Sequence, residues 1–177
     1  MKKSIIASVI ALGLVGASAA QAANNEVTFV GAVTSTTCDV STSVSGAAST
    51  NSVVQLGSVS VGQEGTAVPF AIKATNPSDP ACAALTQQQT ATVHWSSANL
   101  TADGFGATSG VAQDAVALVN AVNAKNANTA INATTNTVEF TADEVISADG
   151  LQFEAKLKGG NTEGDFKSVA VFAMSYK

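Results

Sequence analysis

The chain has 177 residues, with eight lysines, no arginine and thirteen acidic residues, and its formal net charge is −5. A surface that binds the phosphate backbone of a nucleic acid is basic, so this acidic composition argues against a nucleic-acid partner. Val, Thr, Ala, Ser, Asn and Gly are abundant and aromatic residues are few, which favours short strands with many turns over helices.

The first 22 residues have the pattern of a secretory signal. A basic start at residues 1–3 precedes an apolar run from Ile5 to Val15, and residues 20–22 give the small-x-small pattern that signal peptidase reads. The alternative is a membrane anchor, but the run is shorter than a spanning helix and no second run follows it. We predict cleavage after Ala22 and a mature exported chain of about 155 residues, which suits one domain.

An alternating stretch over residues 26–34 follows the predicted cleavage site. Val27, Phe29, Gly31 and Val33 fall on alternate positions, so they share one face of an extended chain. A glycine within a strand often marks the close approach of another backbone or of a bulky group. We predict that this strand completes the fold of another molecule, the alternative being that it is the protein's own first strand.

The two cysteines, Cys38 and Cys82, are an even pair in a chain predicted to be exported. Such a pair most often forms a disulfide in an oxidising compartment such as the bacterial periplasm. A redox or metal-binding pair needs close spacing such as Cys-x-x-Cys, or nearby histidines, and the sequence has neither. We therefore predict a structural disulfide, worth roughly 4 kcal/mol in the chain-entropy model.

The region between the cysteines predicts one loop and two strands. Residues 39–51 are rich in Ser, Thr, Gly and Ala and are typical of a loop. A strand is expected over 52–61, then a turn at the glycines of 62–65, then a strand over 66–75 that the prolines of 76–80 bring to an end. The predicted inward positions are Val54, Leu56, Val59, Val68, Phe70, Ile72 and Ala74.

The middle of the chain predicts strands separated by polar connections. Residues 89–97 and 136–141 alternate as strands, whereas 99–110 is interpreted as a long loop and 123–135 as an exposed connection. Residues 114–122 suit a strand or a short helix, and the all-β context favours the strand. The predicted inward positions are Ala91, Val93, Trp95, Val138 and Phe140.

The C-terminal region alternates most strictly. Leu151, Phe153, Ala155 and Leu157 alternate with polar residues, a glycine-rich turn follows at 159–164, and residues 167–177 return as a second strand. We predict that these two strands pair as a half-buried hairpin. About seven or eight short strands at this spacing predict an antiparallel sandwich.

In this order and spacing, the segments resemble the pilins of the chaperone–usher fimbriae, the surface pili of enteric bacteria. The resemblance spans the mature chain, and its last part is similar to the adhesive shaft pilins of enterotoxigenic bacteria. The motifs that carry it are the N-terminal arm with its central glycine, Cys38, Val54-Gln-Leu-Gly57, Cys82, Val93-His-Trp95, Phe153-x-Ala155-x-Leu157, and Ala170-x-Phe172-x-Met174-x-Tyr176 with its tyrosine next to last.

The resemblance implies an incomplete immunoglobulin-like antiparallel β-sandwich, which lacks its last strand and has an apolar groove beside the C-terminal strand. A periplasmic chaperone lends a strand to this groove. At the outer-membrane usher, the N-terminal arm of the next subunit then replaces the chaperone strand. The resemblance places Val27, Phe29, Gly31 and Val33 on the donor strand, and Ala170, Phe172, Met174 and Tyr176 at the acceptor groove and chaperone-docking edge.

The implied organisation is a signal peptide over 1–22, a donor arm over 23–34 and a pilin sandwich over 35–177. A single domain that has both a donor arm and an acceptor groove indicates a repeating shaft subunit of a surface fimbria. Its partners would be identical or related pilins, and the fimbria would support adhesion to host cells. Two alternatives remain: a monomeric secreted binding module, or a shaft subunit that itself binds host glycoconjugates. The candidate contacts to an acidic glycan are Lys156, Lys158 and Lys167, whose alternative role is that of solvated surface lysines.

An enzyme is not expected. His94 lies on the opposite strand face from Trp95 and has no recognisable base or metal partner in the sequence. The sequence holds no nucleophile elbow, zinc motif, phosphate loop or calcium loop, so neither a cofactor nor a metal is predicted. Trp95 could stack on a sugar, but a core anchor between the sheets is the favoured interpretation.

Overall fold

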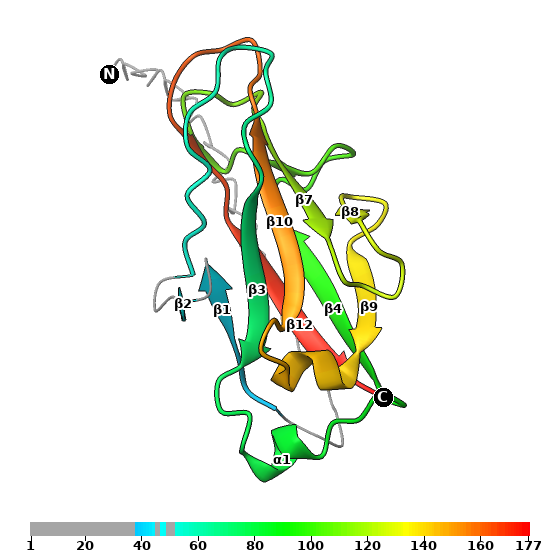
Figure 1. The fold of residues 1–177 in the computed structure, drawn as a ribbon. Coiled ribbons are helices and arrows are strands. Elements are labelled where there is room, and N and C mark those ends of the chain that lie inside the picture. Colours follow the sequence, from blue (N-terminus) through cyan, green and yellow to red (C-terminus); the bar gives the residue numbers. More distant parts are fainter. Residues whose placement is uncertain (1–37, 45–46, 49–51) are drawn as a thin grey trace, which may run out of the picture.

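The computed structural model describes residues 38–44, 47–48 and 52–177 (Figure 1). The predicted signal peptide and donor arm, with Val27, Phe29, Gly31 and Val33, lie outside the described residues. In the part of the chain that is described, no helix has the length and apolar character needed to cross a membrane.

The described chain consists mainly of short strands, with one short α-helix and one 3-10 helix. In chain order the elements are β1 (Val40–Val44), β2 (Ala47–Ala48), β3 (Val68–Ala74), α1 (Pro80–Ala83), β4 (Thr90–Ser97), β5 (Phe105–Gly106), β6 (Ser109–Gly110), β7 (Val116–Ala121), β8 (Thr129–Ile131), β9 (Thr137–Thr141), η1 (Ala142–Ile146), β10 (Leu151–Lys158), β11 (Phe166–Lys167) and β12 (Ala170–Tyr176).

The described strands form two main sheets and a small one, with antiparallel pairing throughout. The large sheet has the order β2-β1-β3-β10-β7-β5, and β8 pairs with β7. The second sheet has the order β12-β4-β9, and β11 pairs with β6. Figure 1 shows β12 (red) and β4 behind the strands of the large sheet. The predicted antiparallel sandwich is therefore confirmed.

The core lies between the two main sheets and uses the inward positions that the alternation predicts. Every inward residue of β4, β9 and β10 named above is buried. Trp95 packs edge-on against Phe153, with ring centroids 5.5 Å apart, and Phe70 stacks on Phe153 at 5.3 Å. Trp95 is therefore a core anchor between the sheets, as the favoured interpretation holds.

The predicted disulfide joins Cys38, just before β1, to Cys82 in α1. Pro80 starts the helix, and the side chain of Asp79 accepts a hydrogen bond from the N–H of Ala81 at its N-terminus. Cys82 is buried within the core cluster. The bridge thus fixes the beginning of the described chain against the end of β3.

The C-terminal hairpin prediction is wrong. β10 pairs with β3 on one side and with β7 on the other, so both of its edges are occupied within the large sheet. β12 pairs with β4 in the second sheet. In Figure 1 the connection after β10 loops over the top of the molecule, and β12 returns in the layer behind. The physical reason is that β10 is covered on its inward face by the opposite sheet, of which β12 is a part.

Four further segments differ from their predicted states. The predicted loop at 39–51 contains β1 and β2, and β1 pairs with β3. Residues 52–60 contain no strand, although Val54 and Leu56 pack against the core as predicted. The predicted loop at 99–110 contains β5 and β6, and buries Phe105. The predicted exposed connection at 123–135 contains β8, which buries Ile131 against the core. The strands β5, β6 and β8 are only two or three residues long, which is too short for an alternating pattern to predict them. Residues 116–121 form a strand rather than a helix, as the context indicated.

Candidate functional site: an apolar groove beside the last strand

A groove of about 1590 Å³ runs along the sandwich between the segment 52–61 and the C-terminal end of the chain. One side is made by residues 52–61, and the other by the connection 162–169 and the first residues of β12. The floor consists of core side chains from both sheets. These are Phe70, Trp95, Phe105, Ala117, Val119, Ala155 and Leu157.

The strand β12 presents a free backbone edge toward this side of the molecule. Among the described strands β12 pairs with β4 alone. Just beyond it, the main chains of Lys177 and Thr90 exchange two hydrogen bonds, of 3.0 and 2.7 Å. Bonded and non-bonded pairs alternate in an antiparallel ladder, so every second residue of β12 directs its N–H and C=O groups away from β4. By this register, those residues are Ala170, Phe172, Met174 and Tyr176.

The inward side chains of β12 are less covered than those of the other core strands. Phe172 and Met174 are half-buried and pack against the core cluster, whereas the inward residues of β10 are fully enclosed. The Phe172 ring lies 5.3 Å from that of Trp95. The apolar row of β12 is thus covered by the core from below and left open on the groove side.

The opposite wall, residues 52–61, has no strand partner in the described chain. Leu56 and Val59 pack inward, while Val53 is exposed. The wall is attached at its end, where Gly65 N–H donates to the Leu157 carbonyl at 2.8 Å. Two stretches of main chain therefore flank an apolar floor, and neither has a ladder partner toward the groove among the described residues.

This arrangement can accept an extended peptide. An inserted strand finds backbone donors and acceptors at β12, and an apolar floor for alternate side chains. An exposed sheet edge next to uncovered apolar surface also promotes aggregation, so such a groove needs an occupant. The chemistry is that of strand addition, in which main-chain bonds give affinity and floor contacts give specificity.

The structure places the four C-terminal residues that the resemblance assigned to the acceptor edge on one strand. Ala170 and Phe172 line the groove, and Met174 continues the same row toward Tyr176. Tyr176 is buried, and its hydroxyl donates to the Cys38 carbonyl at 3.3 Å. Burial, followed by the negative charge of Asp39, raises the pKa of Tyr176 to about 12. The apolar row of β12 thus ends beside the disulfide, close to the first of the described residues.

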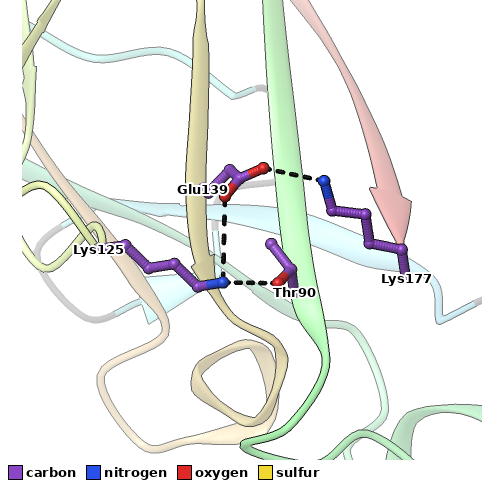
Figure 2. A network of polar contacts seen from close by, with 4 residues as sticks. All are labelled: Thr90, Lys125, Glu139 and Lys177. Atoms are coloured by element: carbon purple, nitrogen blue, oxygen red, sulfur yellow. Dashed lines mark hydrogen bonds and ion pairs between the residues drawn. The ribbon is translucent and has the colours of Figure 1, made fainter.

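A polar network fixes the C-terminal end of β12 to the rest of its sheet (Figure 2). Lys177 Nζ donates to Glu139 on β9 at 3.0 Å. Lys125 Nζ lies 4.0 Å from the other carboxylate oxygen and donates to Thr90 Oγ1 at 2.6 Å. The hydrogen bond and the charge of Lys177 lower the pKa of the Glu139 carboxyl from its usual 4.5. The network spans β12, β4 and β9 on the face that points away from the core.

The three candidate glycan-binding lysines are separated by the fold. Lys156 and Lys158 lie on the outward face of β10, whereas Lys167 lies on β11 in a different sheet. Lys156 Nζ is 3.7 Å from a carboxylate oxygen of Glu64, and Lys158 Nζ is 3.6 Å from one of Asp103. Two of the three charges thus already have a carboxylate partner, and a role of these residues in glycan contact stays a prediction.

His94 lies on the exposed face of β4, where its Nδ1 is 2.9 Å from Thr137 Oγ1. Among the described residues, no group of three or more His, Cys, Asp or Glu side chains could hold a metal ion. This side of β4 faces away from the groove, because the neighbouring positions Val93 and Trp95 point into the core.

Several groove residues were missed by the sequence analysis. Phe105 and Phe166 lie in short segments of glycine, serine and charged residues, so no periodic pattern surrounded them. The hairpin turn was predicted at 159–164 and the returning strand from residue 167, yet residues 162–169 form part of the groove wall. The signal that could have revealed the other wall is the pair Val54 and Leu56, an apolar alternation with no strand assigned to pair with it.

Comparison with known proteins bears on the family and the fold of the chain. No protein-family model matches the chain. The chain is 37% identical to the F107 fimbrial protein of Escherichia coli over 177 residues, which is 100% of both chains. Its fold is similar to that of the P pilus rod subunit PapA, with a TM-score of 0.51 over 86% of this chain and 99% of that chain at 16% identity. With this identity over its full length, the chain belongs to the fimbrial proteins, as a structural subunit of the bacterial surface fimbria.

Proposed function

We propose that the groove is the acceptor site for a donor strand, and that the fimbria grows when residues 23–34 of one subunit insert into the groove of the next. The observation that carries this proposal is the free edge of β12 beside an apolar floor. The edge offers main-chain groups at Ala170, Phe172, Met174 and Tyr176, the same four residues that the resemblance assigned to it.

The composition of the arm supports this assignment. Val27, Phe29 and Val33 share one face, and burying each contributes roughly 1.5–3 kcal/mol, which gives roughly 5–8 kcal/mol before any main-chain hydrogen bond forms. Gly31 interrupts this row and, by the resemblance, would face a place where the acceptor groove is too shallow for a side chain. The arm supplies what the groove lacks: an extended chain with an apolar face.

The partners before assembly follow from the exposed groove. A subunit with an unpaired edge beside apolar surface is prone to aggregate in the periplasm. A periplasmic chaperone that lends a strand to β12 would prevent this, and an outer-membrane usher would provide the place of exchange. The domain limits proposed with this function remain a signal peptide over 1–22, an arm over 23–34 and a sandwich over 35–177.

Deletion of residues 23–34 from the mature chain tests the donor role. The variant keeps its own groove, so we expect it to be recovered with the chaperone but to be unable to serve as a donor. Sheared surface material from producing cells is run on a denaturing gel with and without boiling. Wild type should give a ladder that collapses to one band on boiling, because exchanged strands dissociate slowly.

The matched control replaces residues 23–34 by a scrambled sequence of the same length and composition, in which the apolar residues no longer alternate. It should behave like the deletion. Normal ladders from either variant would contradict the donor assignment. A single monomer band from wild type in both lanes would instead indicate a self-contained domain.

A further inference from the structure

One end of the groove is formed by a connection that contains three glycines. Residues 159–165 link β10 to β11, and most of them line the groove. Gly159, Gly160 and Gly164 lie in this connection, so its backbone has more conformational freedom than that of an ordinary loop. Its position must therefore be set by contacts with neighbouring elements.

The side chain of Asp114, just before β7, makes such contacts. Its Oδ2 accepts a hydrogen bond from the Asn161 N–H at 2.6 Å, and its Oδ1 accepts one from the Thr162 N–H at 3.3 Å. A Cβ at Gly160 would lie 2.3 Å from Asp114 Cγ, so the loop backbone rests directly on the carboxyl group. These hydrogen bonds, that from Asn161 most of all, lower the pKa of Asp114. Asp114 is therefore negatively charged when it accepts these hydrogen bonds from the loop backbone.

The same loop also holds the opposite wall of the groove. Gly62 N–H donates to the Gly160 carbonyl at 2.9 Å, and Gly159 N–H donates to the Gln63 carbonyl at 2.8 Å. Gly62 and Gln63 directly follow the wall segment 52–61. A continuous series of contacts thus runs from the Asp114 carboxylate through the loop to the end of this wall.

Between these contacts lies a small apolar cluster, separate from the main core. Ala112, Ala115 and Leu157 are buried there, and all three line the groove. The partly buried residues packed against them come from both walls of the groove. They are Leu56, Val59 and Phe166.

We propose that Asp114 is a positioning residue that keeps this end of the groove open for an incoming strand. The inference rests on the proposed function of the groove. Without the carboxylate, Asn161 and Thr162 lose their hydrogen bonds to Asp114. This part of the loop then settles over the partly buried residues of the apolar cluster, because covering apolar surface is favourable. The groove is then open for only part of the time. The apparent affinity of the incoming strand equals its affinity for the open groove multiplied by the fraction of time that the groove is open.

The connection keeps a second attachment when Asp114 is replaced. The main-chain carbonyl of Asp165 accepts hydrogen bonds from Val111 N–H at 2.9 Å and from Ala112 N–H at 3.1 Å. These bonds involve no atom of Asp114. Gly159 and Gly160 also keep their main-chain bonds to Gln63 and Gly62. The expected change is therefore confined to residues 161–163, and the sandwich itself stays folded.

The test measures strand entry with a defined probe, a fluorescein-labelled peptide of residues 23–37 of this chain. The mature subunit is refolded with its disulfide formed and held at low concentration, with the peptide in excess. Stopped-flow anisotropy gives association rates, and competition with unlabelled peptide gives dissociation rates. The variants are D114A, D114N, which keeps one carbonyl oxygen as an acceptor, and D149N, a charge-matched control in the exposed turn at the other end of β10.

We expect D114A to slow association by about tenfold, the factor that corresponds to a groove open about one tenth of the time, with an unchanged dissociation rate. D114N should be intermediate and D149N should match wild type. The peptide-binding kinetics of G160A, whose Cβ would displace the loop from Asp114, should resemble those of D114A. G160A keeps the Asp114 carboxylate but separates the loop from it, so it tests the position of the loop independently of the loss of the charge.

Two results would overturn the inference. If D114A or G160A lowers the unfolding temperature while the association rate of the folded protein stays that of wild type, Asp114 is structural and does not position the groove. If wild type itself fails to bind the peptide, both the acceptor role of the groove and the inference built on it are wrong. Wild-type binding with D114A indistinguishable from it would reject the inference and retain the proposed function.

Discussion

At the scale of single residues, Tyr176 connects the end of β12 to the disulfide. Its buried hydroxyl donates to the Cys38 carbonyl, and burial together with the charge of Asp39 raises its pKa to about 12. A tyrosine whose folded-state pKa exceeds its ordinary value of 10.0 contributes stability that is fully present below that value. This contribution is lost as the pH rises from the unfolded pKa through the folded one.

Tyr176→Phe should lower the free energy of unfolding by about 1 kcal/mol near neutral pH, because one buried hydrogen bond is lost. The deficit should shrink at about pH 11, where ionisation of the unfolded tyrosine penalises wild type alone. Denaturant unfolding at the two pH values measures both effects. A deficit of the same size at both pH values would contradict the assignment.

Glu139 gives the opposite pH dependence. Lys177 lowers its pKa from 4.5 in the folded protein, so its contribution is present above this value and lost as the pH falls through the lowered pKa. Between about pH 5 and about pH 3, the unfolding temperature of wild type should therefore fall further than that of Glu139→Gln. Glu154→Gln on β10 is the control, and it should follow the wild-type curve. Parallel curves for wild type and Glu139→Gln would show that the network in Figure 2 adds no acid sensitivity.

At the scale of elements, β12 has two faces with different roles. Phe172 faces the groove and is half-buried, whereas Ser175 lies on the outer face and is not among the residues that line the groove. An inserted strand would complete the burial of Phe172 and leave the side chain of Ser175 unchanged. Complete burial of a phenylalanine is worth roughly 1.5–3 kcal/mol, and about half of this remains to be gained.

Phe172→Ala should therefore weaken the binding of the arm peptide about tenfold. Ser175→Ala, on the outer face of the same strand, should bind like wild type and controls for changes in strand propensity. Fluorescence anisotropy with the labelled peptide of residues 23–37 gives both dissociation constants. Equal losses in the two variants would mean that the peptide does not enter by the groove face of β12.

At the scale of the whole molecule, the disulfide offsets the incompleteness of the sandwich. The bridge joins Cys38 to Cys82 across a sequence separation of 44 residues, and it holds β1 beside α1 and the end of β12. Closing a loop of this length stabilises the folded state by roughly 4 kcal/mol. This is a large share of the stability of an ordinary domain, and the groove lowers what the core alone can supply.

Replacing both cysteines by serine should accordingly remove roughly 4 kcal/mol from the unfolding free energy of the subunit with the arm peptide bound. Urea unfolding of that complex measures the loss, and wild type treated with a reductant is the chemical counterpart of the variant. A loss below about 1 kcal/mol in both would show that the bridge does not constrain the unfolded chain as this loop length requires.

Much of the fold could be predicted from the sequence because alternation is a local property. Strand positions at β3, β4, β7, β9, β10 and β12 were predicted, and every predicted inward residue of β4, β9 and β10 is buried. The pairing of Cys38 with Cys82 followed from compartment and number. The four residues on the free edge of β12 were assigned through the family resemblance. The alternation alone predicts their inward direction but not that they lie at a groove.

What the sequence by itself determined is therefore which side of each strand faces the core, because a period of two residues fixes the face without any partner. The tertiary structure alone decided which strands pair. β10 has β3 and β7 as neighbours and cannot pair with β12, and residues 52–60 remain without a ladder. Pairing depends on contacts between residues far apart in the chain, and the groove exists because two such edges find no partner among the described residues.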